Sequence, residues 1–304
     1  MDLNGDGHDD VLSGSYSPGD LYVFYGTPGG GFSAGEILKD AEGKNLNVGG
    51  PRKWEDRPAS DGLAPSPFAF DADGDGLLDL YVGNLQGYVF LIPNEGTPTK
   101  PVFNAQKKRK LECDGQPIKV RGDAGPCVAD WDGDGKPDLL VGSADGSVWF
   151  YRNIGTRTAA RYAPGIAIVP QSEMSFGNPV KHGAAPDRPG IRTKVCVVDW
   201  NGDGRPDLLV GDLWYEHSAG ADLTPENKRR LEELRTTIGT LSEEIQALLD
   251  KQDDRSITGS ARKSLTDQVV KLVEQRDTLA REREALAPSP AYHGSVWLYL
   301  RTAK

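Results

Sequence analysis

The chain has 304 residues, enough to bury a sizeable core, and 37% of them are hydrophobic. Its formal net charge of −10 argues against the basic stripes that nucleic-acid binding requires. No apolar run approaches the length of a membrane span, so we expect neither a nucleic-acid partner nor a spanning helix.

The first predicted element is an acidic loop that runs into a strand, and this unit occurs four times. The copies begin at Asp2, Asp71, Asp130 and Asp199. They read DLNGDGHDDVLSG, DADGDGLLDLYVG, DWDGDGKPDLLVG and DWNGDGRPDLLVG, with start-to-start spacings of 69, 59 and 69 residues. A long unit at near-constant spacing indicates a repeat architecture.

Oxygen-bearing side chains occupy positions 1, 3, 5 and 9 of every copy, and a glycine at position 6 allows a sharp turn. Alternate residues of a tight loop can point at one centre, and the carbonyl of position 7 can add a ligand. All-oxygen ligation with several carboxylates favours Ca²⁺ over Mg²⁺. We therefore predict about four calcium sites, which would bring the formal charge of −10 to −2. The predicted ligands are Asp2, Asn4, Asp6, His8 and Asp10; Asp71, Asp73, Asp75, Leu77 and Asp79; Asp130, Asp132, Asp134, Lys136 and Asp138; and Asp199, Asn201, Asp203, Arg205 and Asp207.

The flanking sequence separates these loops from an EF-hand, which needs a bidentate Glu at position 12 and a helix on each side. Position 12 here is Ser or Val. Short apolar runs such as Phe68-Ala69-Phe70 and Leu80-Tyr81-Val82 flank the loops and are typical of buried strands. A hairpin without metal is the alternative, but a turn does not need acids at four alternating positions. We therefore expect strand, metal loop, strand.

The pattern D-x-[DN]-G-D-G-x-x-D-[LV]-x-x-G resembles the FG-GAP/VCBS repeat, the calcium-loop blade of integrin α-subunit-type β-propellers. The resemblance covers all four copies and the strands around them. It implies an all-β propeller whose blades have four antiparallel strands, with the metal loop joining the first two. It also implies an extracellular or cell-surface interaction module, without fixing the ligand.

The blades follow the loops in order, beginning with blade one from Asp2 to about Gly50, which lacks a strand before its loop. Third strands are predicted at 21–25, 88–92, 147–151 and 295–299, and Asn-x-Gly-Thr follows the second and third of these. Fourth strands are predicted near Val102-Phe103 and at 166–169. The segments 44–67 and 176–192 are predicted to be long loops between blades.

Blade four is interrupted by an insertion of 79 residues between Gly211 and Gly294. Thr224-Pro225-Glu226 predicts a helix start. A heptad seam then follows, and a break near Gly259 precedes a second helix that Pro288 ends. We expect an antiparallel coiled-coil hairpin roughly 40 Å long. The apolar seam positions are Leu231, Leu234, Ile238, Leu241, Ile245 and Leu248 in the first helix and Leu265, Val269, Leu272, Leu279 and Leu286 in the second.

We assign residues 1–212 to blades one to three and the first half of blade four, 213–290 to the hairpin, and 291–304 to a return strand. Both end blades are incomplete. Three arrangements fit: part of a larger propeller, a four-bladed ring, or a half that pairs with another chain. We favour the first, because relatives that this type resembles commonly have seven blades. Because Met1 adjoins the first loop with no signal peptide before it, we also expect an artificial or processed chain boundary.

Two short features have ordinary interpretations. Cys127 and Cys196 each lie three residues before a metal loop, and we expect small buried residues there, with a disulfide between them as the alternative. Arg121-Gly122-Asp123 matches an integrin-recognition tripeptide, and we expect a plain glycine turn.

The sequence favours a non-catalytic, calcium-stabilised interaction module for adhesion or assembly, located outside the cell, at its surface or in the periplasm. A glycan-binding propeller is the alternative, with Trp54, Trp214 and Tyr215 as candidate contacts. We expect no enzyme and no catalytic residues, because the four histidines, including His182, His217 and His293, are scattered. A protein or glycan partner is expected on the face opposite the metal loops, and the hairpin or the open blade ends could support oligomers.

Overall fold

The computed structural model describes residues 1–49, 62–175, 178–217, 224–252 and 258–302. Within these residues the chain is mostly β, with antiparallel sheets and two long helices. It divides into a blade unit (Met1–Asn178, Pro186–Trp214 and His293–Lys304) and a hairpin unit (Pro179–Ala185 and Tyr215–Tyr292).

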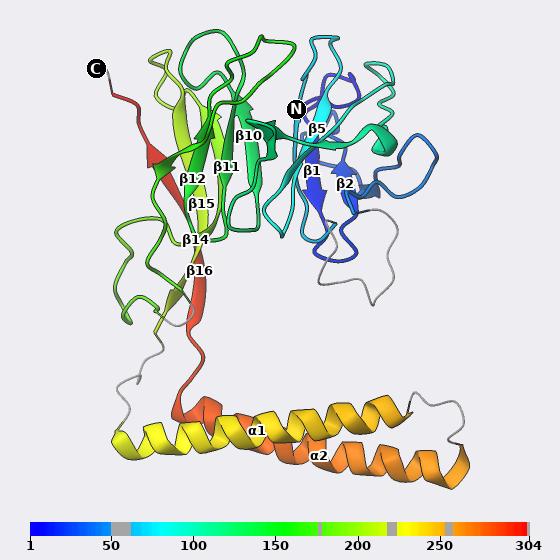
Figure 1. Cartoon of the computed structure of the whole chain (residues 1–304), viewed down its shortest axis with the longest axis vertical. Coiled ribbons are helices and arrows are strands. Elements are labelled where there is room, and N and C mark those ends of the chain that lie inside the picture. Colours follow the sequence, from blue (N-terminus) through cyan, green and yellow to red (C-terminus); the bar gives the residue numbers. More distant parts are fainter. Residues whose placement is uncertain (50–61, 176–177, 218–223, 253–257, 303–304) are drawn as a thin grey trace. The chain divides into compact units, whose positions relative to one another are not determined.

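Four antiparallel sheets form the blade unit and follow the order of the predicted blades (Figure 1). Blade one contains β1 (Val11–Gly14), β2 (Leu21–Phe24) and β3 (Glu36–Ile37). Blade two contains β4 (Ser66–Phe70), β5 (Asp79–Gly83), β6 (Val89–Ile92) and β7 (Arg109–Lys110). Blade three contains β10 (Gly125–Ala129), β11 (Asp138–Gly142), β12 (Val148–Tyr151) and β13 (Ile166–Val169). Blade four contains β14 (Ile191–Val198), β15 (Asp207–Glu216) and β16 (Ala291–Tyr299).

The connection from blade two to blade three contains the short helix η2 (Ala105–Lys107) and a small hairpin of β8 (Glu112–Cys113) and β9 (Gln116–Pro117).

Three predicted strand positions are wrong, one in blade two and two in blade four. The fourth strand of blade two is β7, because Phe103 is buried and forms only isolated bridges with Asp40 and Asn94. In blade four, β15 and β16 extend beyond Gly211 and Gly294, so those glycines do not end the strands.

Apolar residues on both faces of each sheet build the core between neighbouring blades. On β5, Leu80 packs toward blade one and Tyr81 packs toward blade three. On β11, Leu139 packs toward blade two and Leu140 packs toward blade four. Because successive strand residues point to opposite faces, one strand serves two interfaces, which explains why every residue of β5 and β11 is buried.

Backbone hydrogen bonds fasten each blade to the next where its first strand begins. Asp123 N donates to Leu85 O at 2.9 Å, and one repeat later Arg192 N donates to Ala144 O at 3.1 Å. Ala64, Asp123 and Arg192 have φ angles of 47°, 51° and 55°, a left-handed conformation that such residues rarely adopt. The conformation recurs at the repeat spacing, so it belongs to the junction between blades.

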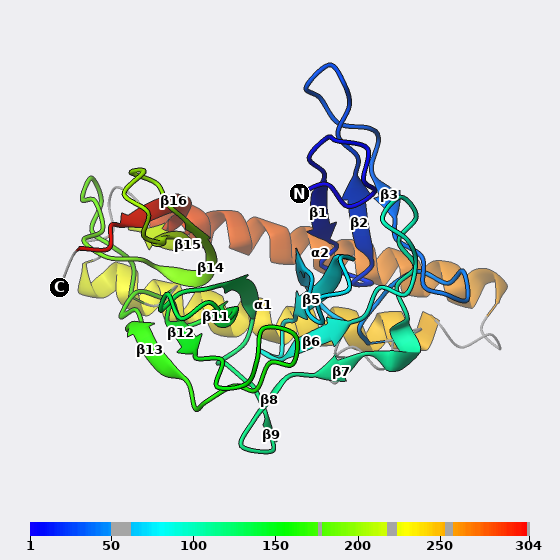
Figure 2. The same ribbon diagram turned by 90° about the horizontal axis from the view of Figure 1, so that it is seen from above.

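The four sheets form an open succession with blade one at one end and blade four at the other (Figure 2). Contacts join β1 to β4, β4 to β10, and β10 to β14. Among the strands that the structure describes, no contact of comparable extent joins blade four to blade one. The blades and their order therefore fit a propeller, but the sheets do not close into a ring.

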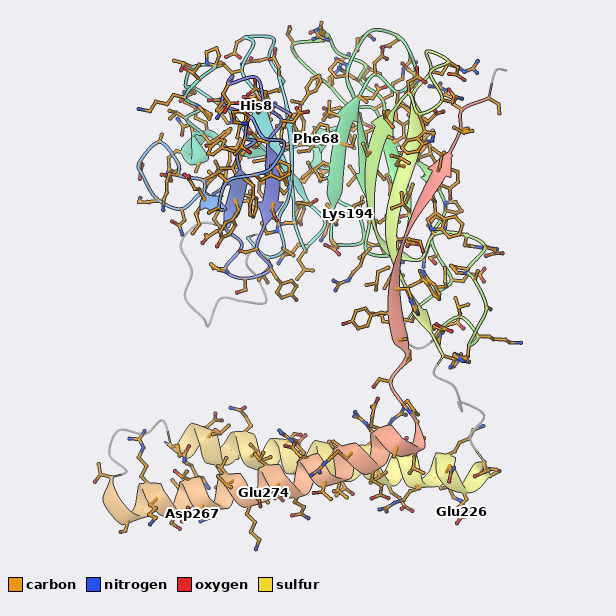
Figure 3. All side chains as sticks on the ribbon, turned by 180° about the vertical axis from the view of Figure 1, so that it is seen from behind. His8, Phe68, Lys194, Glu226, Asp267 and Glu274 are labelled. Atoms are coloured by element: carbon orange, nitrogen blue, oxygen red, sulfur yellow. The ribbon has the colours of Figure 1, made fainter. Side chains whose placement is uncertain are left out.

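The hairpin unit contains α1 (Pro225–Gln252) and α2 (Gly259–Leu286). The predicted start is confirmed, since Asn227 N donates to Thr224 Oγ1 at 3.2 Å. The second helix begins at Gly259, next to the predicted break. The two helices run antiparallel, with Glu226 and Asp267 near opposite ends of the hairpin (Figure 3).

The predicted apolar seam of the hairpin is only partly buried. Leu231, Leu234, Leu241 and Ile245 of α1 are buried, whereas none of the residues of α2, all of which are described, is fully buried. Val270 is 50% exposed. Cross-helix pairs such as Arg230 with Glu282, at 2.8 Å, are exposed and contribute little. The predicted seam residues of α2 are half-buried: Leu265, Val269, Leu272, Leu279 and Leu286.

The cysteines are free, so the alternative disulfide does not form. Cys127 is buried as predicted, but Cys196 is exposed, and the prediction of a buried residue is wrong there. The two occupy equivalent positions on β10 and β14. Blade four covers Cys127, whereas no described element covers Cys196.

This difference predicts unequal thiol reactivity. Burial raises the pKa of the Cys127 thiol to about 12, so little reactive thiolate exists at mildly alkaline pH. We expect an alkylating reagent to modify Cys196 in the folded protein at low protein concentration and Cys127 only after denaturation, as measured by mass spectrometry of peptides. Cys196→Ser is the control for the background from Cys113. Equal labelling of Cys127 and Cys196 in the folded chain would contradict the blade packing.

Candidate metal centre

The acidic loops lie between the first and second strands of blades two, three and four, and directly before β1 in blade one. His8 marks the first loop in Figure 3. The glycines at positions 4 and 6 have φ between 68° and 88° in every copy, so both turns need a conformation that glycine tolerates. The prediction had assigned this role to position 6 alone.

The aspartate at position 1 folds the loop around its own carboxylate. In the third loop, Asp130 Oδ1 accepts a hydrogen bond from Gly133 N and Asp130 Oδ2 accepts one from Gly135 N, both at 2.9 Å. Asp71 and Asp199 accept equivalent bonds at 2.7–3.1 Å, whereas Asp2 accepts from Asp6 N at 3.1 Å and from Gly7 N at 2.8 Å. The carboxylate therefore holds the turn, and each of its oxygens keeps a further lone pair for a cation.

The aspartate at position 9 is buried and ties the loop to the sheet. Asp138 is 0% exposed, and its Oδ2 accepts from Trp131 N and its Oδ1 from Asn153 N, at 3.0 and 2.7 Å. Burial raises the pKa of Asp138 and of its counterpart Asp79, while the backbone N–H groups oppose that shift. Asp10, Asp79 and Asp207 accept the same two kinds of backbone bond.

Positions 1, 3 and 9 bring their carboxylates together in two loops. One oxygen from each of Asp71, Asp73 and Asp79 lies within 4.8 Å of the others, and Asp130, Asp132 and Asp138 form the same group. The position-5 acids are not part of these groups. Three converging carboxylates repel one another and match the hard-oxygen donor set that Ca²⁺ prefers, so the residues present fit this ion.

The loops differ in how nearby cations neutralise their acids. In the third loop, Arg152 contacts Asp132 at 2.6 Å and Asp134 at 3.1 Å, and Lys136 Nζ lies 2.8 Å from Asp134. Arg205 pairs with Asp203 at 2.6 Å in the fourth loop. Within the described residues, no ion pair is found on the acids of the second loop. The second loop therefore has the strongest uncompensated negative charge.

The first and fourth loops carry an asparagine at position 3. Asn4 Nδ2 donates to Asp6 Oδ2 and Asn201 Nδ2 donates to Asp203 Oδ2, each at 3.0 Å. The side-chain oxygens of both asparagines accept from the N–H of position 5 at 3.0–3.1 Å. The backbone N–H of position 7 donates to the position-5 carboxylate in all four loops. Ligation by the position-7 carbonyls of His8, Leu77, Lys136 and Arg205 stays a prediction.

A family model described as FG-GAP-like repeat matches residues 2–82 and 130–210, together more than half of the chain. Each matched stretch contains two acidic loops and the strands beside them. The chain belongs to the FG-GAP-like repeat family. This FG-GAP-like repeat protein matched no curated protein. In the described part of the chain, neither α1 nor α2 nor any other helix has the apolar length that crossing a bilayer requires.

The asparagine of each Asn-x-Gly-Thr turn is a supporting residue whose role the sequence analysis missed. Asn153 Oδ1 accepts from Gly155 N at 2.9 Å and from Arg161 N at 3.1 Å, while its own N–H donates to Asp138. Asn94 makes the corresponding bonds in blade two. The recurrence of this turn 59 residues apart is the sequence signal that indicates a structural role for its asparagine.

Proposed function

We propose that this FG-GAP-like repeat protein is a non-catalytic interaction module that works outside the cytoplasm and is stabilised by calcium. The converging carboxylates at positions 1, 3 and 9 carry the proposal, because they sit on a loop that already joins two strands. Members of this family are generally non-catalytic and typically mediate protein interactions.

Calcium would be held by the side chains at positions 1, 3 and 9, with positions 5 and 7 as further candidates. The bound ion would supply positive charge that relieves repulsion among the carboxylates. The chain itself preorganises the loop, since the backbone N–H groups already orient the carboxylates of Asp130 and Asp138. Ion binding and folding of the hairpin would therefore reinforce each other.

The partner would bind at the strand ends opposite the metal loops, where the turns between second and third strands and the connections between blades lie. A cavity of about 380 Å³ there is lined by residues from all four blades, including Ser13, Pro65, Asp123 and Lys194. Lys194 Nζ donates to Asp123 O at 2.6 Å, and burial lowers the pKa of Lys194. Asp123 is 8% exposed, which supports the turn interpretation of the Arg-Gly-Asp tripeptide.

The glycan alternative receives no support from its two candidate tryptophans. Trp54 lies outside the described residues. Trp214 stacks on His293 with ring centroids 4.3 Å apart, and its Nε1–H donates to Ser295 Oγ at 2.9 Å. Trp214 is therefore engaged in packing the sheet of blade four.

An ion count on a loop variant tests the calcium proposal. We expect the wild-type chain to bind about four calcium ions in equilibrium dialysis. Asp130→Asn removes a carboxylate that every copy carries at position 1 and should lower the count by about one or weaken that site at least tenfold, since ligand charge sets calcium affinity. Asp187→Asn is the matched control, because among the described residues Asp187 pairs only with its neighbour Arg188 at the surface. An equal count and equal affinity in the wild-type chain and Asp130→Asn would contradict the proposal.

A further inference from the structure

We propose that blade four docks onto blade one of a second copy of this chain, in a head-to-tail contact that continues the stacking of blades. The repeat register defines the two surfaces. The distal face of blade four comprises Cys196, Val198, Trp200, Leu209, Val296 and Leu298. The proximal face of blade one comprises Val11, Ser13, Tyr22 and Phe24. The contact does not depend on bound calcium.

The distal face repeats a surface that is buried one blade earlier. Val148 and Phe150 on β12 pack toward blade four and are 0% and 9% exposed. Their counterparts Val296 and Leu298 on β16 are 73% and 40% exposed. Trp131 is half-buried at the junction of blades three and four. Its counterpart Trp200 is 61% exposed.

The same comparison explains the exposed Cys196, whose counterpart Cys127 is 2% exposed. Each position of the distal face therefore has the chemistry of an interface between blades. Nothing in the described part of the chain covers it. Contiguous apolar surface of this kind marks an interaction site, and the register specifies a blade as the shape that fits.

The proximal face of blade one has the complementary pattern. Strand alignment places Val11, Tyr22 and Phe24 at the positions that Leu80, Phe90 and Ile92 hold in blade two. Those three residues of blade two are 0–3% exposed because they pack against blade one. In blade one, by contrast, Val11 is 43% exposed, and Tyr22 and Phe24 are half-buried.

Each copy therefore carries both halves of one interface, at opposite ends of its succession of blades (Figure 2). Such a contact is heterologous, so it closes at two copies if the rotation between them permits and otherwise propagates. The occupant needs a sheet with apolar residues on the second and third strands, which blade one supplies. Blade one of a second copy has these apolar residues, so a second copy is the partner that we propose.

Sedimentation of the full chain over a range of concentrations tests the contact. We expect concentration-dependent association of the wild-type protein. Val296→Glu and Val11→Glu should each raise the dissociation constant at least about tenfold, because either places a charge in an apolar interface. Ile166→Glu is the matched control, since Ile166 is 59% exposed on β13 and lies outside both faces. Circular dichroism checks that each variant is folded.

Mixing the two face variants separates a head-to-tail contact from other dimers. Val296→Glu retains an intact proximal face and Val11→Glu retains an intact distal face, so the mixture should form a two-chain species at a concentration where each variant alone is monomeric. Contact between two distal faces would not recover on mixing. Association broken by Val270→Glu but not by Val296→Glu would assign dimerisation to the hairpin unit. Either result overturns the proposal.

Thiol labelling gives an independent readout. Cys196 lies within the distal face, so its alkylation should slow as the wild-type protein associates and should stay fast in Val296→Glu. A wild-type chain that remains monomeric at every concentration, with Cys196 equally reactive throughout, would also overturn the proposal.

Discussion

Asp138→Ala is expected to lower the free energy of unfolding by about 3 kcal/mol or more, the largest loss from any single carboxylate of the third loop. Asp138 is 0% exposed and accepts from Trp131 N, Asp132 N and Asn153 N. Truncation leaves these N–H groups without their acceptor, and each buried donor that lacks a hydrogen bond costs about 1–3 kcal/mol. Chemical denaturation in the presence of a chelator measures this loss of stability without any contribution from a bound ion.

Asp134→Ala is the matched control for that experiment. Asp134 belongs to the same loop, but it is exposed, and its pairs with Lys136 and Arg152 are surface contacts. Its loss should cost less than about 1 kcal/mol. Equal destabilisation by the two variants would mean that position 9 does not join the loop to the sheet.

Gly142→Ala is expected to destabilise the blade unit by about 2–3 kcal/mol. A Cβ at Gly142 would lie 2.2 Å from Thr193 O, which belongs to the first strand of the next blade. Backbone cannot move aside as the end of a flexible side chain can, so the two blades must separate. Gly83 meets Ala124 O in the same way at 2.0 Å, so the approach is a property of the repeat.

The matched control is Gly211→Ala, at the equivalent position of blade four. The nearest atom to a Cβ there is Lys194 O at 3.8 Å, since no described blade follows. We expect an effect near zero or a slight stabilisation, because alanine has less freedom than glycine in the unfolded chain. Thermal unfolding of both variants at low protein concentration measures the difference in their stability. Similar losses from both would show that steric contact between blades is not the cause.

The repeat made much of this fold predictable. Four acidic loops at near-constant spacing identified the hairpin beside each loop, and short apolar runs such as Leu80-Tyr81-Val82 identified buried strands. The capping residue Thr224 and the heptad leucines gave the helical hairpin. These features depend on residues that are close together in the sequence, so they can be predicted from the sequence alone.

The wrong predictions concern residues whose environment depends on segments that are distant in the sequence. Phe103 has strand propensity, but burial between blades one and two takes it out of the sheet. Cys196 has the same local sequence as Cys127, and only the presence of a following blade separates them. The backbone bonds accepted by Asp138 were invisible for the same reason, because Asn153 lies fifteen residues further along the chain.

Thermal unfolding with calcium and with a chelator, alongside a metal count, tests the central claim that calcium stabilises these blades. We expect about four ions per chain and a fall in Tm of roughly 10 °C or more on chelation, because ligand binding to the folded state adds directly to its stability. A chain that binds no metal and keeps the same Tm in chelator would contradict the claim, and the acidic loops would then be turns held by their backbone hydrogen bonds alone.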